Sequence, residues 1–213
     1  MNDAKIMQIS PNMLKTYEQC PAKFYLKYVK NIAMPVNEDI FEFGKNIHAI
    51  ASYYLKNENV DKMEGSLTSN ESLLWNYLKN LPYFSYEVVN TEYNLAFKYD
   101  DIFLGGRIDA LVKKENKYYI LDYKTGSVPQ NAKYDFQTII YFLAVHKFFK
   151  TSNIAFIYID LKNKSEIIID FTDELKTEYL LKLKNILTKI YSLDSFTHNK
   201  ECNCEYKAVC NFT

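Results

Sequence analysis

Residues 105–126 read GGRIDALVKKENKYYILDYKTG and contain two runs of alternating residues on either side of the polar pair Glu115-Asn116. Alternation with a period of two is typical of β-strands, and a short polar turn between two such runs predicts a hairpin. If Glu115 and Asn116 form a two-residue turn, in which the asparagine tolerates a left-handed conformation, opposing residue numbers sum to 231. This stretch therefore predicts an antiparallel strand pair.

The hairpin carries acidic residues inside its apolar pattern. In the two-residue register Asp109 lies opposite Asp122, whereas a four-residue loop pairs Asp109 with Ile120; both registers place the carboxylates on one face, about 5 to 7 Å apart. Such carboxylates repel unless a cation lies between them, and their oxygens suit Mg²⁺ or Mn²⁺. Lys124 shares that face, where an ammonium group can stabilise charge developing on a phosphate or orient water.

The motif Asp-x-Lys alone is weak evidence, because a strand-end ion pair between Asp122 and Lys124 explains it equally well. The chain holds two further motifs in which an acid precedes a lysine by two residues. One is at a hairpin end, Asp160-Leu161-Lys162, and one is in a helical segment, Glu174-Leu175-Lys176. Neither has a second acid on an adjacent strand at the required register. The acid at position 109 therefore distinguishes the first copy from the other two.

Patterns elsewhere in the chain predict an α/β or α+β fold with one mixed sheet flanked by helices. Ser10 followed by Pro11 is a helix start, and Pro21 predicts a break in that helix. A period of two between residues 85 and 123 predicts a three-stranded meander. The expected helices are 11–28, 41–54, 73–78, 134–149 and 173–191, and the expected strands are 88–99, 103–112, 118–123, 154–160 and 165–171.

Length and composition bound the class of protein. The 213 residues, 48% of them apolar, allow one domain over residues 1–213 with a sizeable core. No apolar stretch is long enough to cross a membrane and no secretory signal is evident, so a soluble cytoplasmic protein without a membrane partner is expected. The net charge is zero, so a polyanion would have to be bound by local groups. Arg107 is the single arginine.

The cysteines lie at the two ends of the chain. In a reducing compartment disulfides are disfavoured, so the alternatives are a metal site, with zinc among the candidates, and free thiols. The four residues are Cys20, Cys202, Cys204 and Cys210.

Four motifs occur in an order that resembles the RecB-like branch of the PD-(D/E)XK nuclease superfamily. They are Gly44 with His48 in FGKNIH, Gly106 to Asp109 in GRID, Asp122 to Gly126 in DYKTG, and Gln137 with Tyr141 in QTIIY. Together with an opening helix of similar sequence they span residues 9–210. The resemblance implies a restriction-endonuclease-like core with a mixed central sheet.

The resemblance also implies roles for individual residues. His48, Asp109, Asp122 and the backbone carbonyl of Tyr123 would bind Mg²⁺ or Mn²⁺, with Asp109, Asp122 and Lys124 forming the catalytic set. Gln137 and Tyr141 would support the site or contact DNA, and Arg107 would contact a phosphate or a neighbouring acid. Glu92, two strands away from Asp122, is an optional further acid.

The cysteine arrangement resembles that of the iron-sulfur nucleases of this branch, of the CRISPR-associated Cas-four type or AddB. It implies a 4Fe-4S cluster on Cys20, Cys202, Cys204 and Cys210 that joins the ends at 1–30 and 193–213. One residue separates Cys202 from Cys204 where the family usually has two, so Cys202 is the doubtful ligand and His198 a substitute. Zinc and free thiols stay open as alternatives.

The function implied is a divalent-metal-dependent DNA exonuclease that hydrolyses phosphodiester bonds, in single strands from 5′ to 3′. The implied pathway is CRISPR spacer acquisition with integrase proteins as partners, or a phage relative of that system. Two alternatives come from other classes: a non-catalytic DNA-binding adaptor for a CRISPR integrase, and an endonuclease or RNA nuclease of the same fold. The sequence makes no prediction of oligomeric state.

Overall fold

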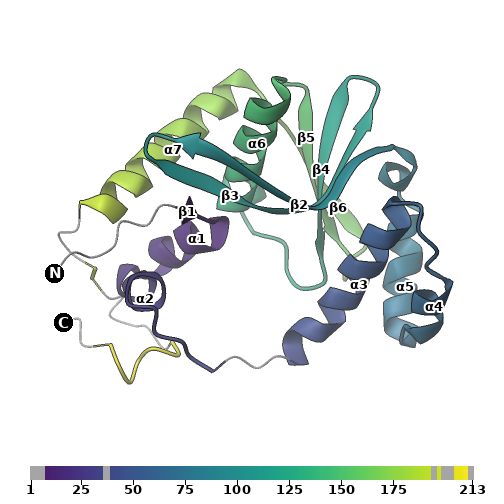
Figure 1. Cartoon of the computed structure of the whole chain (residues 1–213), viewed down its shortest axis with the longest axis horizontal. Coiled ribbons are helices and arrows are strands. Elements are labelled where there is room, and N and C mark those ends of the chain that lie inside the picture. The colour runs from purple at the N-terminus through teal and green to yellow at the C-terminus, as the bar shows by residue number, and fades with distance from the viewer. Residues whose placement is uncertain (1–7, 36–38, 193–195, 198–203, 211–213) are drawn as a thin grey trace.

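A mixed β-sheet lies between two layers of helices in the computed structural model, which describes residues 8–35, 39–192, 196–197 and 204–210 (Figure 1). The strands are β1 (Gln8–Ile9), β2 (Glu87–Tyr99), β3 (Ile102–Lys114), β4 (Lys117–Lys124), β5 (Ile154–Asp160) and β6 (Ser165–Asp170). The α-helices are α1 (Pro11–Gln19), α2 (Pro21–Phe24), α3 (Asp39–Leu55), α4 (Asp61–Ser66), α5 (Ser69–Lys79), α6 (Phe136–Phe149) and α7 (Asp173–Tyr191). Shorter turns are the π-helix η1 (Tyr25–Val29) and the 3₁₀ helices η2 (Pro82–Ser85) and η3 (Ala132–Tyr134).

The sheet combines antiparallel and parallel pairs, as the sequence predicted. Its described strands follow the order β1-β3-β4-β5-β6, and β2 pairs with β3 as well. The meander β2-β3-β4 and the pair β5-β6 are antiparallel, whereas β4 and β5 run parallel and are connected through α6. A helix is the usual crossover between parallel neighbours, because a tight turn cannot reverse the chain twice.

The hairpin of β3 and β4 has the two-residue register. Lys114 pairs with Lys117 and Ala110 with Leu121, so opposing numbers sum to 231. The expected left-handed residue was wrong: the positive φ of 54° belongs to Glu115 and not to Asn116. The ladder ends at Ala110, one pair before Asp109 would face Asp122.

One edge of β3 is interrupted where the strand carries the sequence Gly105 to Asp109. The strand β2 pairs along β3 from Ile102 to Lys113 and so occupies one edge. The other edge is shared: β1 pairs with Phe103 and Leu104, and β4 pairs from Ala110 onwards. Among the described strands, none pairs with residues 105–109 on that edge. The two-residue strand β1 was not predicted from the sequence.

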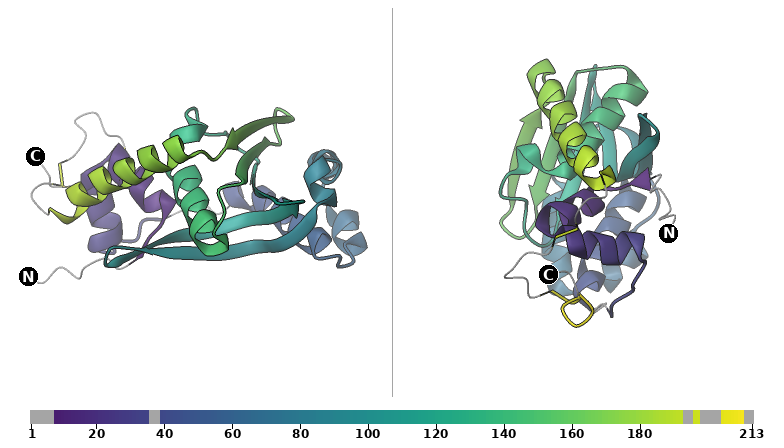
Figure 2. Two further views of the ribbon diagram at one scale, coloured as in Figure 1. Left: turned by 90° about the horizontal axis from the view of Figure 1, so that it is seen from above. Right: turned by 90° about the vertical axis from the view of Figure 1, so that its left-hand side faces the viewer.

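Each face of the sheet packs on its own helical layer. The first apolar core joins α1, α6 and α7 to one face, and its members include Leu14, Ile140, Leu183, Leu104 and Phe156. The second joins α3 and α5 to the opposite face, with Ile47, Ile50, Trp75, Leu121 and Ile157 among its members. The views in Figure 2 show α6 and α7 on one side of the sheet and α3, α4 and α5 on the other. No helix of the described residues is long and apolar enough to span a membrane.

Caps fix where the helices begin. The side chain of Ser10 accepts a hydrogen bond from the backbone N–H of Met13 and Pro11 occupies the first turn, as predicted. The helix is interrupted at Cys20, whose backbone is extended with a φ of −160°, and α2 begins at Pro21. Proline suits a first turn and disrupts a helix interior, which explains the break.

The C-terminal segment packs against the N-terminal helices. The hydroxyl of Tyr206 donates to the backbone oxygen of Ile32 at 2.9 Å, and Lys23 forms an ion pair with Glu205 at 3.1 Å. Figure 1 shows this segment, in yellow, near α2. Segments about 180 residues apart in the sequence are thereby joined.

Candidate functional site

A histidine and two carboxylates from three elements converge beside the interrupted edge of β3. One ring nitrogen of His48 (α3) and one oxygen each of Glu92 (β2) and Asp109 (β3) all lie within 4.8 Å of one another. His48 Nδ1 is 3.3 Å from Asp109 Oδ1 and 3.9 Å from Glu92 Oε1. These three side chains, which we name the acid-histidine group, are partly exposed. Mixed oxygen and imidazole donors suit Mn²⁺ and related divalent cations.

The ring of His48 is oriented by the strand that follows the hairpin turn. Its Nε2 lies 3.1 Å from the backbone oxygen of Tyr123, which can only accept, so Nε2 donates and Nδ1 faces the carboxylates. Burial lowers the pKa of His48, but the hydrogen bond and charge of Asp109 and the charges of Asp122 and Glu92 outweigh it, leaving that pKa raised. The site is therefore strongly anionic and favours a cation.

The side chain of Asp109 accepts a hydrogen bond from β4 where a backbone oxygen of β3 would otherwise do so. Its Oδ2 accepts a hydrogen bond from the backbone N–H of Tyr123 at 2.9 Å, just beyond the last pair of the β3-β4 ladder. The side chain is thus fixed on both sides, by Tyr123 through one oxygen and by His48 through the other. An acid held in this way cannot rotate away when its neighbours repel it.

Asp122 lies deeper than the acid-histidine group and is only 1% exposed. Its Oδ2 is 2.7 Å from Lys124 Nζ, and its Oδ1 accepts a hydrogen bond from Gln137 Nε2. Lys124 also donates to Gln137 Oε1 at 3.1 Å, so the three side chains form a closed network. Burial raises the pKa of Asp122, Asp109 raises it further, and Lys124 opposes both. Asp122 does not join the group of atoms within 4.8 Å.

Gly44 allows α3 to approach the strand end that carries this network. A Cβ atom at position 44 would lie 3.1 Å from Thr125 Oγ1, which is tighter than ordinary contact. His48 follows Gly44 by one turn and shares its helix face. The GxxxH motif therefore combines a glycine that lets the helix pack closely with a histidine placed one turn later on the same face.

Tyr141 fills the interruption on β3. Its hydroxyl donates to the backbone oxygen of Arg107 at 2.7 Å, and the side chain is 5% exposed. A Cβ atom at Gly106 would lie 2.9 Å from that hydroxyl, so glycine leaves the space for the ring. Both roles expected for Tyr141, support of the site and contact with DNA, stay predictions.

Arg107 contacts a neighbouring acid, one of the two partners expected for it. Its Nε lies 2.9 Å from Glu92 Oε2, and its side chain is 63% exposed. Because Glu92 is bound by Arg107 through one oxygen, its other oxygen is directed to His48. The arginine thus positions Glu92 while keeping most of its own surface open to solvent.

Glu92 is the residue whose place the sequence indicated least well. Thr91 pairs with Ala110 and Tyr93 with Ile108, so the register between β2 and β3 brings Glu92 level with Asp109. The signal was present in the turn at Asp100-Asp101, which fixes that register. The positive φ of 49° at Glu92, which re-aims the side chain, has no sequence signature.

The cysteines are only partly within the described chain, and Cys202 and its proposed substitute His198 lie outside it. Cys20 is buried and its sulfur accepts a hydrogen bond from the backbone N–H of Lys23 at 3.4 Å. Cys204 and Cys210 are partly exposed free thiols. No group of three described cysteines has sulfurs within 4.8 Å of one another.

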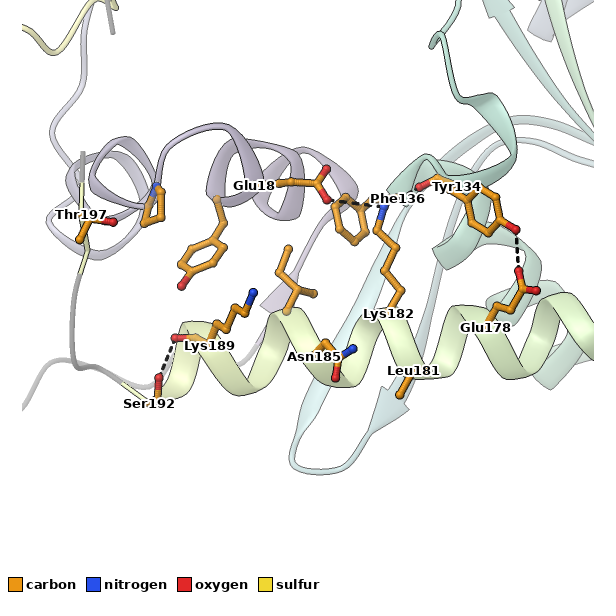
Figure 3. Close-up of a pocket in the computed structure, with 13 residues that line it drawn as sticks. Glu18, Tyr134, Phe136, Glu178, Leu181, Lys182, Asn185, Lys189, Ser192 and Thr197 are labelled. Atoms are coloured by element: carbon orange, nitrogen blue, oxygen red, sulfur yellow. Dashed lines mark hydrogen bonds and ion pairs between the residues drawn. The ribbon is translucent and has the colours of Figure 1, made fainter. Parts of the chain in front are cut away.

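A larger cavity of about 750 Å³ lies away from the acid-histidine group, between α1 and α7 (Figure 3). Two pairs of its polar side chains contact each other: Tyr134 donates to Glu178 at 2.7 Å, and Lys182 contacts Glu18 at 3.5 Å. Lys182 also covers the ring of Phe136 at 4.4 Å from the ring centre. None of the predicted site residues lines this cavity.

This chain is similar to known nucleases in sequence and in fold. Over 124 residues the chain is 29% identical to the CRISPR-associated exonuclease Cas4 of Francisella tularensis subsp. novicida. That match covers 56% of this chain and 62% of the relative, so the similarity spans about three fifths of the relative's length. The solved structure of a candidate exonuclease from Eubacterium rectale matches with a TM-score of 0.58, covering 93% of this chain and 86% of the other at 11% identity.

The structural match supports the fold alone, because its sequence identity is low. A family model extends the sequence evidence: the model of the PD-(D/E)XK nuclease superfamily matches residues 8–85 and 70–211. The matched ranges contain every residue of the acid-histidine group and the network of Asp122, Lys124 and Gln137. The chain belongs to the PD-(D/E)XK nuclease superfamily.

Proposed function

We propose that this protein is a divalent-metal-dependent deoxyribonuclease that hydrolyses phosphodiester bonds in single-stranded DNA. The observation that carries the proposal is the acid-histidine group, in which His48, Glu92 and Asp109 present ligand atoms within 4.8 Å of one another. Next to it lie a buried acid and an ammonium, Asp122 and Lys124. The superfamily is one of nucleases, which agrees with this chemistry.

The donor set fits a divalent cation. One oxygen of Glu92 and one of Asp109 lie within 4.8 Å of each other and of the same imidazole nitrogen, and charges of like sign are held that close most readily around a cation. We propose His48, Asp109 and Glu92 as ligands of Mg²⁺ or Mn²⁺, with Asp122 and the carbonyl of Tyr123 completing the site from β4. When bound, such an ion supplies Lewis-acid polarisation of a phosphate oxygen and a more acidic water.

Lys124 is the proposed electrostatic catalyst. Its ammonium is held by Asp122 at 2.7 Å and by Gln137 at 3.1 Å, so it is positioned before substrate binds. A preorganised cation beside a phosphate stabilises the negative charge that grows in the transition state, and it costs no reorganisation when the reaction occurs. Gln137 positions both Asp122 and Lys124 and is a positioning residue in this scheme.

The test is hydrolysis of bis(p-nitrophenyl) phosphate and of a labelled DNA strand, with Mg²⁺ or Mn²⁺ and with chelator. We expect Lys124→Ala to lower kcat by roughly 10²- to 10³-fold, the usual loss for one stabilising group. Lys184→Ala, at an exposed position of α7, is the matched control and keeps full activity. Absence of hydrolysis by the wild type with either metal would overturn the proposal.

Finer features are proposed on the strength of the relative's name and the motif resemblance. We propose digestion from the 5′ end, and a role in CRISPR spacer acquisition beside integrase proteins, since the relative is a CRISPR-associated exonuclease. Strands labelled at either end distinguish the two polarities. Co-purification with integrase proteins encoded beside this gene tests the pathway.

A 4Fe-4S cluster on Cys20, Cys202, Cys204 and Cys210 is proposed to join the two ends of the chain. The contacts of Tyr206 with Ile32 and of Glu205 with Lys23 support it, because they place the segment that holds Cys204 beside the helix that follows Cys20. An anaerobic preparation that is brown and contains iron is expected. Stoichiometric zinc without iron would replace the cluster by a zinc site.

A further inference from the structure

A second hollow, of about 430 Å³, begins at the acid-histidine group and follows α3 away from it. Its walls include His48 and Glu92 at one end and Lys56 at the other. Figure 1 shows α3 beside the meander that contains β2, so the hollow lies between a helix and the sheet margin. It is continuous with the candidate metal site and leads from that site to the surface.

One face of α3, continued by the residue that follows the helix, supplies two lysines along this hollow. Lys45, Ser52 and Lys56 recur at spacings of seven and four residues, which places them on the same side of the helix as His48. The two lysines are exposed and have no ion-pair partner among the described residues. A rise of 1.5 Å per residue separates their Cα atoms by about 16 Å along the axis. Two fixed cations so spaced suit successive parts of a polyanionic chain.

Tyr53 adds an aromatic surface at the margin of the hollow. Its side chain is 45% exposed, and its ring contacts no other ring in the described part of the chain. The next residue shows the contrast, because the ring of Tyr54 packs edge-on against Trp75 at 5.2 Å. An unpacked ring between lysines is the arrangement by which proteins stack the bases of a single strand.

The charge of the hollow depends on the metal site. Lys45, Lys56 and Arg107 are opposed by Glu58 and by Glu92, which Arg107 already binds at 2.9 Å. The charged side chains therefore give the hollow a small net positive charge, and a bound divalent cation would increase it. The two lysines lie on α3 and directly after it, along one wall of the hollow, and a single wall of cations suits the backbone of one strand.

We infer that the hollow along α3 is the path of a single DNA strand, with phosphates bound by Lys45 and Lys56 and one base stacked on Tyr53. This inference rests on the proposed function, because it takes the acid-histidine group as the point at which the strand is cut. It names the residues that hold the strand beyond the cleaved phosphate. Binding of the strand along the hollow can be measured without hydrolysis.

The test measures binding without chemistry. Fluorescence anisotropy follows the full chain as it binds a labelled oligothymidine strand in the presence of EDTA, over a series of salt concentrations. Oligothymidine stacks little on itself, so the contribution of a protein ring is easily seen. We expect Tyr53→Ala to weaken binding at least about fivefold, and Tyr53→Phe, which keeps the ring, to bind as the wild type does.

The lysines are tested by the salt dependence. Each lost phosphate contact lowers the slope of log K against log salt by about 0.7 for single strands, so Lys45→Ala combined with Lys56→Ala should lower it by about 1.4. Lys184→Ala on α7 is the matched charge control and leaves the slope unchanged. Thermal melting of every variant establishes that the fold is intact.

Three results would overturn the inference, and the first two are equal binding by the wild type and the Tyr53 and lysine variants, and tighter binding of a duplex that is insensitive to Tyr53→Ala. A wild type that does not bind the strand at all is a third. These failures are separable from failure of the proposed function, because hydrolysis of bis(p-nitrophenyl) phosphate requires no strand path. If the substitutions leave strand binding unchanged while the wild type still hydrolyses bis(p-nitrophenyl) phosphate, the strand path is rejected and the proposed function is not.

Discussion

Glu92 is shared between an arginine and a histidine, at 2.9 Å from Arg107 Nε and 3.9 Å from His48 Nδ1. Such a carboxylate is fixed before any cation arrives, because rotation toward solvent would break the contact with Arg107. Asp109 is fixed similarly by Tyr123 and His48. At the scale of residues, the acid-histidine group is therefore held in place by pairwise contacts among its members and their neighbours.

Glu92→Gln is expected to weaken Mn²⁺ binding by about tenfold or more, since it removes one anionic ligand from the site. Titration calorimetry or the electron paramagnetic resonance of free Mn²⁺ measures the affinity without reference to activity. Glu87→Gln, an exposed glutamate on the same strand, is the control and retains the wild-type affinity. Equal Mn²⁺ affinity in Glu92→Gln would exclude Glu92 as a ligand.

Gly106→Ala is expected to destabilise the protein by roughly 1 to 3 kcal/mol, because its Cβ atom overpacks against Tyr141. The added atom would lie 2.9 Å from the hydroxyl oxygen and 3.0 Å from a ring carbon. Urea unfolding measures the loss. Gly65→Ala in α4 has nothing within 4 Å of the added carbon and serves as the control. An equal effect of the two substitutions would contradict the packing argument.

At the scale of elements, α5 holds α3 in place through one buried acid. Glu71 is 3% exposed and caps its own helix by accepting from the backbone N–H of Thr68 at 2.8 Å. Its other oxygen accepts from Asn46 Nδ2, on α3, at 2.8 Å. Asn46 lies two residues before His48, so a capping carboxylate in one helix positions the helix that carries the imidazole.

Glu71→Gln is expected to cost about 1 kcal/mol of unfolding free energy at neutral pH. Hydrogen bonds from Thr68 and Asn46 lower the pKa of Glu71 in the folded protein. A lowered folded pKa stabilises the protein above the ordinary pKa, and that stabilisation is lost as the pH falls through the folded value. The difference between wild type and variant should therefore shrink toward acidic pH. Urea unfolding at several pH values checks this, and a constant difference would contradict it.

The elements also show what sequence patterns can predict. The hairpin, its register and the cap at Ser10 follow from local chemistry, and the register alone brought Asp109 near Asp122. The cap at Thr68 was not predicted, because the expected helix began at residue 73. The strand β1 escaped prediction because two residues carry no periodicity. The second Asp-x-Lys motif, which begins at Asp160, has a structural explanation. The carboxylate of Asp160 accepts a hydrogen bond from the backbone N–H of Asn163 at 2.9 Å and so stabilises the turn.

The acid-histidine group shows where sequence patterns stop. Its members come from α3, β2 and β3, and the ladder ends one pair before the two aspartates face each other. The left-handed backbone at Glu92 and the hydrogen bond from Tyr123 to Asp109 decide which acid faces the histidine. Those contacts depend on tertiary packing, so the sequence could name Glu92 only as an optional further acid beside His48, Asp109 and Asp122.

At the scale of the molecule, a short C-terminal segment closes the chain onto its beginning. Tyr206 is 2% exposed and donates to Ile32, and Lys23 pairs with Glu205. The ring of Phe196 lies 4.6 Å from that of Tyr25, adding an apolar contact to the same junction. These contacts close a loop that contains most of the chain, and closing so long a loop costs little more entropy than closing a shorter one.

Tyr206→Ala is expected to lower the unfolding free energy by roughly 3 kcal/mol, through the loss of a buried ring and a hydrogen bond. Tyr206→Phe keeps the ring and should cost only about 1 kcal/mol. Limited proteolysis is expected to cleave the C-terminal segment faster in Tyr206→Ala than in Tyr206→Phe. If both variants unfold like the wild type, the junction does not stabilise the chain.

The interruption in β3 has a consequence for the behaviour of the protein in solution. Unpaired strand edges recruit strands from other molecules and so promote aggregation. Residues 105–109 form such an edge, yet Tyr141 occupies it through the backbone oxygen of Arg107, and Pro11 lies beside Tyr141 near Gly106. The side chains that shape the site therefore also shield this strand edge from pairing with strands of other copies of the protein.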